Sequence, residues 1–260
     1  MNKLIFGLGA LLVASTASAG VRIETISRDI KTQAADGPAQ IVLVQGGKIR
    51  VNAAKTDTVI LKNGSLFMID DKKKAYREMD KASMKRMMDE AGAAMQQMQD
   101  QLKNMPPEQR AQMEQMMGAN MPGMVTGKKD VYEAKDTGKS DTAEGRKCRI
   151  WNVTRNGQIQ EELCVVPFSS LPGKEDMEKS FKEMAEAFQG MASAVPGAAD
   201  SIKAHNAING YPVRTRFYDN KGKPLGKEQV LKTWSEESVP ASAFEVPAGY
   251  KKEAMPKMGG

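Results

Sequence analysis

The chain has 260 residues, with 38 Lys and Arg against 32 Asp and Glu, so its net charge is +6. Apolar residues make up 40% and aromatic residues 5%, which is too apolar and too weakly charged for a disordered protein. One histidine and two cysteines exclude zinc fingers, sites of several histidines and iron–sulfur clusters, and we predict no cofactor.

The first 19 residues have the pattern of an export signal. Lys3 supplies a positive start, an apolar run covers 4–13, and Ala17-Ser18-Ala19 is a cleavage site of the A-x-A type. The run is too short for a stable anchor, and no later stretch reaches 18 consecutive apolar residues. We therefore expect cleavage after Ala19 and a periplasmic chain of 20–260, one domain without a transmembrane segment. Its mild positive charge is compatible with peripheral contact with an anionic membrane surface.

Residues 21–79 have the pattern of consecutive short strands. Apolar runs rich in Val and Ile alternate with tight turns, among which Gly46-Gly47 and Asn63-Gly64 are the clearest. Short strands joined in this way predict an antiparallel meander.

A first insertion, about 80–118, changes to a helical period. Asp80 is suited to cap a helix that ends near Asn104, because Pro106-Pro107 interrupts it. The apolar positions form a narrow seam whose spacing alternates between four and three residues: Met84, Met88, Ala91, Met95, Met98, Leu102 and Met105.

Cys148 and Cys164 flank a hairpin pattern with Arg155-Asn156-Gly157 at its turn. If the two cysteines face each other directly, the loop has three residues and Gly157 is left-handed. Alternation then places both cysteines on the more polar face, opposite an apolar face with Trp151. Because exported proteins meet an oxidising compartment, we predict a cross-strand disulfide; two free thiols are the alternative.

A second insertion, about 174–206, repeats the helical pattern with the seam Met177, Phe181, Met184, Phe188 and Met191. Strands resume after it. Two narrow seams cannot bury themselves alone, so each helix must pack on another surface. We predict an α+β fold with a single curved antiparallel sheet, a half-barrel of about ten strands. The two Met-rich insertions would pack on its concave face.

Three motifs resemble a bacterial family of exported domains of unknown function. They are 69–76 (IDDKKKAY), 145–151 (GRKCRIW) and the C-terminal 244–252 (FEVPAGYKK). Such domains are similar to the outer-membrane lipoprotein carrier and its receptor. The resemblance implies a curved antiparallel half-barrel that closes over helices around an apolar cavity, and the binding of acyl chains. It implies no catalytic residues.

Methionine is concentrated between Met84 and Met124, and thioethers are soft ligands that hold Cu(I) in an oxidising compartment. The regular helical spacing of many of these residues favours packing in a core or an adaptable groove. A metal site and an oxidisable or partner-binding surface are the alternatives. The candidate Cu(I) ligands are Met84, Met87, Met88, Met113, Met116 and Met117.

The only histidine, His205, has the setting of a helix end, where a protonated imidazole complements the helix dipole. The acidic pair Glu161/Glu162 alternates along a strand, so its carboxylates do not converge and are expected to be solvated. No G-x-S-x-G elbow accompanies the histidine, and we predict that the protein is not an enzyme.

We therefore predict a non-enzymatic periplasmic binding or carrier domain. Its partner would be an apolar small molecule, a lipid, a lipoprotein acyl chain or an exposed hydrophobic segment of an envelope protein, and not a nucleic acid. The seam residues of the two insertions would line the groove or act as a lid. The alternative is a Met-rich envelope stress protein that binds Cu(I), absorbs oxidants or holds unfolded proteins.

Overall fold

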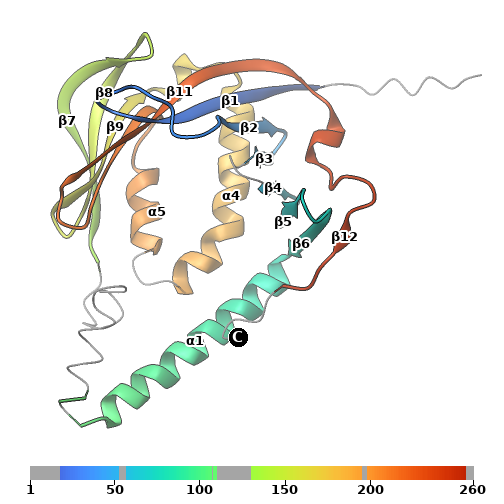
Figure 1. The fold of residues 1–260 in the computed structure, drawn as a ribbon, viewed down its shortest axis with the longest axis vertical. Helices are drawn as coiled ribbons and strands as arrows, with labels where there is room; N and C mark the ends of the chain where they lie inside the picture. The colour runs from blue at the N-terminus through green and yellow to red at the C-terminus, as the bar shows by residue number, and fades with distance from the viewer. Residues whose placement is uncertain (1–17, 53–56, 107, 110–129, 195–197, 256–260) are drawn as a thin grey trace, which may run out of the picture.

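The computed structural model describes residues 18–52, 57–106, 108–109, 130–194 and 198–255. Its described part forms one curved, mainly antiparallel sheet of twelve strands, together with helices (Figure 1). The strands are β1 (Ser18–Asp29), β2 (Gln40–Gln45), β3 (Lys48–Asn52), β4 (Asp57–Lys62), β5 (Ser65–Asp70), β6 (Ala75–Met79), β7 (Tyr132–Ala143), β8 (Arg146–Arg155), β9 (Gln158–Val166), β10 (Tyr211–Tyr218), β11 (Pro224–Val239) and β12 (Lys251–Lys252).

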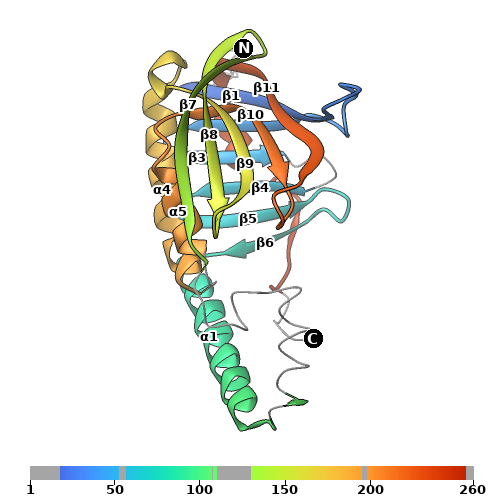
Figure 2. The ribbon, with the colours of Figure 1, turned by 90° about the vertical axis from the view of Figure 1, so that its left-hand side faces the viewer.

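Two meanders, β1–β6 and β7–β11, make up the sheet. They join where β1 pairs with β11, and β12 adds a short parallel strand beside β6. The pairing of β1 with β11 shifts register at Glu24/Thr25, and such irregularities bend a sheet. Figure 2 shows the result, in which β7–β9 run across the direction of β3–β6 behind them. The predicted α+β fold with a single curved sheet is confirmed, with twelve strands rather than about ten.

The helices α1 (Lys81–Asn104), α4 (Lys174–Ala194) and α5 (Ala198–Asn206) are placed differently with respect to this sheet. α4 packs against β1, β2 and β3, while α5 packs against β7 and α4, so the second insertion lies between the two halves of the sheet. α1 contacts β6 and α4 and then extends away from the sheet (Figures 1 and 2). Asp80 caps α1 as predicted, since its carboxylate accepts from the Ser83 amide at 2.7 Å.

The turn at Asn63-Gly64 has the backbone geometry that its sequence predicts. Both residues have positive φ, 52° and 71°, and they join β4 to β5 by a two-residue turn. The strand β7 begins at Tyr132. It continues to Ala143 and turns at Glu144-Gly145 into β8, although its middle is polar.

The disulfide between Cys148 and Cys164 is confirmed, with a Cα–Cα distance of 5.3 Å, but the expected register is wrong. Asn156-Gly157 forms a two-residue turn, and an irregularity between Val153 and Thr154 shifts the pairing, so Cys164 lies opposite Ile150. The cysteine face is also buried rather than polar, because Cys148 and Cys164 are 5% and 0% exposed within the main apolar cluster.

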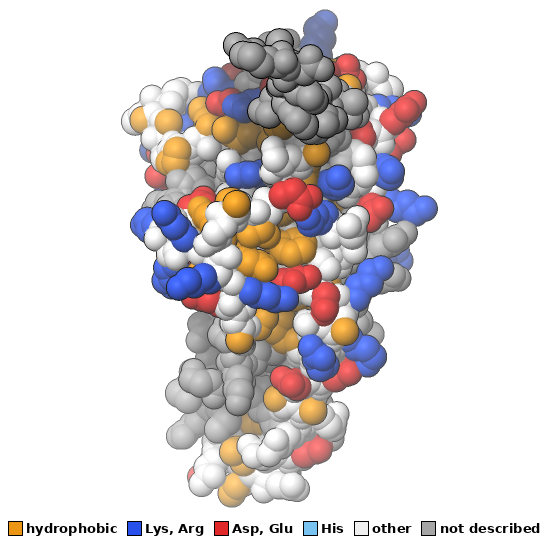
Figure 3. Space-filling view, turned by 90° about the vertical axis from the view of Figure 1, so that its right-hand side faces the viewer, with side chains coloured by type: hydrophobic (Ala, Val, Ile, Leu, Met, Phe, Trp, Pro, Cys, Tyr) orange, Lys and Arg blue, Asp and Glu red, His pale blue; other side chains and the backbone are white. Residues whose placement is uncertain are grey.

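The C-terminal segment covers the face of β4 and β5 that is turned away from the helices (Figure 1). Phe244, in the short 3-10 helix η2 (Ala241–Phe244), is fully buried against Ile60 and Ile69. Val246 and Tyr250 pack beside it, which gives the C-terminal motif a structural role. Figure 3 shows this side of the molecule, where hydrophobic side chains form a strip bordered by charged ones.

Candidate functional site

A largely apolar cavity of about 670 Å³ lies between the second insertion and the strands β9 and β10. Volumes of roughly 300–1,000 Å³ are typical of small-molecule sites. The apolar part of its wall consists of Leu163, Phe168, Phe181, Met184, Ile202, Ile208, Tyr211, Pro212 and Phe217. The space between sheet and helices is therefore hollow and apolar at this place.

The first turn of α4 is fixed to the sheet, and this holds one wall of the cavity in position. Gly173 precedes the helix with φ +70°, and a Cβ there would lie 2.0 Å from the Val21 side chain, so only glycine allows this approach. The Trp234 indole donates to the Pro172 carbonyl at 2.8 Å, and the Gly46 amide donates to the Asp176 carboxylate at 2.7 Å.

Two residues of the predicted α4 seam, Phe181 and Met184, line the cavity. Phe181 packs on Phe168 with ring centroids 5.9 Å apart, yet 36% of Phe181 is exposed. Ile202 on α5 is similarly exposed at 39%. Large apolar side chains from both helices thus reach solvent at the cavity. Met177 is instead 3% exposed within the main core.

Among the predicted residues of the first insertion, those whose side chains the structure describes do not line this cavity. Met84 and Leu102 are buried and Met105 is half-buried, all on the helix that extends from the sheet. The side chains of Met88, Met95, Met98, Phe188 and Met191, and the whole of Met113, Met116 and Met117, lie outside the described residues. Met87 lines a separate cavity of about 330 Å³ with Met79 and Met255.

The charged part of the cavity wall consists of Glu161, Glu178 and His205, of which His205 and Glu161 are paired. The ring atom Nε2 of His205 lies 3.0 Å from the Glu161 carboxylate, and Nδ1 lies 2.8 Å from the Ser201 carbonyl. Both partners are acceptors, so this geometry suits a doubly protonated imidazolium. The hydrogen bond to Glu161 raises the pKa of His205 above its ordinary value, although partial burial opposes the rise. Glu161 is half-buried and paired rather than solvated.

Sequence reasoning missed most of the cavity wall, because the wall comes from strands and loops rather than from the seams. Leu163 is the direct partner of Trp151, so it lies on the apolar face that the hairpin pattern predicts, and Leu163 lines the cavity. Ile208 follows α5 directly and packs with Leu163 in one cluster, and Phe217 lies further along β10. The alternation on β9 was the only signal available for this wall.

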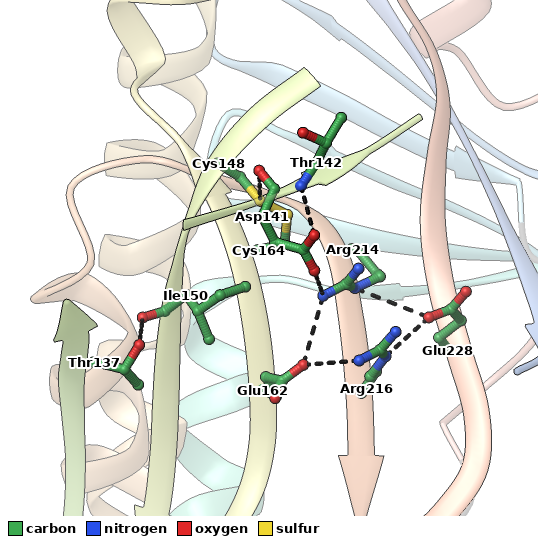
Figure 4. Close-up of a disulfide and its surroundings, with 10 residues drawn as sticks. All are labelled: Thr137, Asp141, Thr142, Cys148, Ile150, Glu162, Cys164, Arg214, Arg216 and Glu228. Atoms are coloured by element: carbon green, nitrogen blue, oxygen red, sulfur yellow. Dashed lines mark hydrogen bonds and ion pairs between the residues drawn. A yellow bond between two sulfur atoms is a disulfide. The ribbon is translucent and has the colours of Figure 1, made fainter. Parts of the chain in front are cut away.

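The opposite face of the same strands carries an ion-pair network. Figure 4 shows Arg214 between Asp141, Glu162 and Glu228, beside the disulfide. Glu228 is 2% exposed and accepts from Arg28 at 2.9 Å and from Arg216 at 3.1 Å. The eight members of this outer network, four of each sign, are Arg28, Asp141, Glu144, Glu162, Arg214, Arg216, Glu228 and Lys232.

Among the residues that the structure describes, no group of three or more His, Cys, Asp or Glu side chains is arranged to hold a metal ion. In the same residues, no helix combines the length and the hydropathy needed to cross a bilayer.

Residues 63–250 match the model of a family described as a domain of unknown function, DUF4412. The chain belongs to this family. Two of the motifs that suggested such a family, 69–76 and 145–151, lie within the matched DUF4412 segment, and the third begins within it. No curated protein matches the chain.

The comparison with solved structures finds weak similarities to the DUF4412 chain at low sequence identity. An uncharacterized conserved protein from Thermus thermophilus has a TM-score of 0.43 and 7% identity, over 93% of each chain. PNGF-II has a TM-score of 0.39 and 7% identity, over 92% of this chain and 31% of the PNGF-II chain. The MucA/MucB complex of Pseudomonas aeruginosa has a TM-score of 0.33 and 11% identity, over 90% of this chain and 56% of the matched chain. At these TM-scores the similarities assign no function.

Proposed function

We propose that this protein is a non-enzymatic binding or carrier domain for an apolar ligand, such as a lipid or a lipoprotein acyl chain. The observation that carries the proposal is the apolar cavity between α4, α5 and the strands β9 and β10. Its wall is mostly aliphatic and aromatic, so a ligand there would gain roughly 25 cal/mol per Å² of apolar surface removed from water.

The cavity wall is suited to entry and release of such a ligand. Phe181 on α4 and Ile202 on α5 are partly exposed, so an apolar ligand would cover them. Met184 beside them is unbranched and polarisable, and methionine adapts to ligands of different shape. α4 and α5 would act as a lid over the concave face of the sheet.

The absence of catalysis is part of the proposal. Both ring nitrogens of His205 are engaged by acceptors, which leaves no lone pair for a general base while the pair with Glu161 is formed. The three sequence motifs resemble a family of exported domains of unknown function, and the similarity of such domains to the lipoprotein carrier also favours binding over chemistry.

We further propose that the protein works in the periplasm. The Cys148–Cys164 disulfide is compatible with an exported protein, since disulfides persist in oxidising compartments. The export pattern of the first 19 residues supports the same location.

An environment-sensitive apolar dye, N-phenyl-1-naphthylamine, tests the binding function. We expect saturable fluorescence enhancement with the full mature chain, and displacement of the dye by lipid. Ile202→Asp places a charge at the cavity wall and should weaken dye binding about tenfold or more, because burying a charge without a partner is costly.

Leu225→Asp is the matched control, since Leu225 is 56% exposed and lies outside the cavity wall. It should leave the dye affinity unchanged. No saturable binding in the wild type, or equal losses in the two variants, would contradict the proposal. Native mass spectrometry of gently purified protein should in addition reveal bound lipid.

A further inference from the structure

A smaller cavity of about 190 Å³ adjoins the apolar cavity. We call the smaller one the inner cavity and the apolar one the outer cavity. They share Tyr211, Pro212, Thr215 and Gln229 in their walls, and the inner cavity continues from there to β1 and β2. Because Thr215 and Gln229 are direct partners in the β10–β11 register, their side chains share the face that α4 and α5 cover.

Three side chains in the inner cavity form a polar cluster. The Gln229 amide nitrogen donates to the Thr25 hydroxyl at 3.1 Å and to the Gln40 amide oxygen at 3.3 Å. The Thr25 hydroxyl donates to the same oxygen of Gln40 at 3.5 Å. Thr25 is only 7% exposed, so this cluster lies deep in the sheet.

These bonds leave hydrogen-bonding capacity unused. With the amides oriented in this way, the Gln40 amide nitrogen and the Gln229 amide oxygen make no hydrogen bond to any residue that the structure describes. One is a donor and the other an acceptor. Neither atom is among the fully buried side-chain atoms that lack a partner in the described part of the chain, so a ligand group in the cavity can reach and pair with both.

The inner cavity is uncharged. Its wall consists of Thr25, Gln40, Val42, Tyr211, Pro212, Thr215, Gln229, Val230 and Leu231, none of which is acidic or basic. A carboxylate or phosphate would lose its hydration there without gaining a counter-charge. The chemistry that fits is an uncharged group with both a carbonyl acceptor and a hydroxyl donor.

We propose that the inner cavity binds the ester and hydroxyl groups of a neutral single-chain lipid, a monoacylglycerol, whose acyl chain occupies the outer cavity. The ester carbonyl accepts from the Gln40 amide nitrogen, and a glycerol hydroxyl donates to the Gln229 amide oxygen. This assignment rests on the proposed function of the outer cavity, and it adds the headgroup that the cavity selects.

The test compares monoolein with oleate as competitors of the dye, on the full mature chain. The two share one acyl chain, and they differ in whether their headgroup is charged. The wild type should bind monoolein about tenfold or more tightly than oleate. Gln40→Leu, in the wall of the inner cavity and not of the outer one, should weaken monoolein binding about five- to tenfold, the loss of one net hydrogen bond or slightly more, and leave oleate and dye affinity unchanged.

Gln160→Leu is the control, because Gln160 hydrogen-bonds to backbone carbonyls outside both cavities. If circular dichroism shows that Gln40→Leu is not folded, then Gln40→Met, which keeps a side chain of similar length without the amide, decides the matter. Equal affinity for the two lipids, or unchanged monoolein binding in the folded variant, overturns the headgroup assignment alone. No binding of dye or of either lipid by the wild type overturns the assignment and the proposed function together.

Discussion

His205 is the one imidazole of the chain, and it ties α5 to β9 through Glu161. The pKa of His205 is raised in the folded state, so the charged ring is favoured by folding. The stability gained is therefore fully present below the ordinary pKa of 6.5 and is lost as the pH rises through the folded value. The His205 side chain is 41% exposed, and solvent screening keeps the gain below about 1 kcal/mol.

We expect His205→Leu to destabilise the protein more at pH 5.5 than at pH 8.5. Urea unfolding at both values, with the wild type beside the variant, measures the difference. Because no second histidine is present, a loss of pH dependence in the variant is assigned directly to this ring. A wild type and a variant whose midpoints differ by the same amount at both pH values would contradict the pairing.

At the scale of single elements, the contribution of the disulfide to thermal stability can be predicted. The disulfide links residues 16 apart across β8 and β9, and closing a loop of this size stabilises by about 3 kcal/mol in the chain-entropy view. The double variant Cys148→Ser/Cys164→Ser should lower Tm by roughly 6–12 °C for a domain of this size. Calorimetry checks this.

Reductant provides the internal control for the disulfide. It should lower the Tm of the wild type toward that of the serine variant and leave the variant itself unchanged. A wild type with the same Tm under both conditions would show that the β8–β9 hairpin does not depend on the covalent link.

The elements that follow local rules could be predicted from the sequence. Asp80 capping α1 and the turn at Asn63-Gly64 depend on neighbours in the chain. The register at the cysteines could not, because the irregularity at Val153/Thr154 moves every later pair by one residue. The polar segment of β7 pairs with β8 on both sides of an irregularity between Asp136 and Ser140, and this pairing with another strand could not be predicted from the segment's own residues.

At the scale of the whole molecule, the cavity wall depends on elements distant in the sequence. Phe181 and Met177 belong to the same helical seam, yet Phe181 is partly exposed and Met177 is buried. This difference results from where α4 packs on the sheet. The polar cluster in the inner cavity joins Thr25, Gln40 and Gln229, which are brought together by the pairing of β1 with β2 and β11. Neither the difference in exposure along α4 nor this polar cluster can be predicted from the periodicity of the sequence.

The outer network also joins distant parts, since Glu144 at the β7–β8 turn pairs with Arg28 on β1 and Lys232 on β11. Burial alone would raise the pKa of Glu228, but hydrogen bonds from Arg28 and Arg216 hold it below its ordinary value. The pKa of Glu144 is lowered chiefly by its hydrogen bond from Lys232. Carboxylates of this kind stabilise the fold above their ordinary pKa of 4.5, and the gain disappears as the pH falls through the lowered folded values.

We therefore expect stability to fall between about pH 4.5 and pH 2.5, and Glu228 to account for part of this loss. Glu228→Gln removes the buried carboxylate that Arg28 and Arg216 share, although each guanidinium keeps a second carboxylate partner, and it should cost about 2 kcal/mol at pH 7. The cost should shrink as the pH falls below 4.5 and through the lowered folded pKa of Glu228, because the wild-type carboxyl then becomes protonated as well. Urea unfolding across this range checks both statements, with Glu237→Gln, an exposed position on the same strand, expected to change stability by less than about 0.5 kcal/mol. A difference between wild type and Glu228→Gln that stays constant from pH 7 to pH 2.5 would mean that the charge of Glu228 does not hold the two halves of the sheet together.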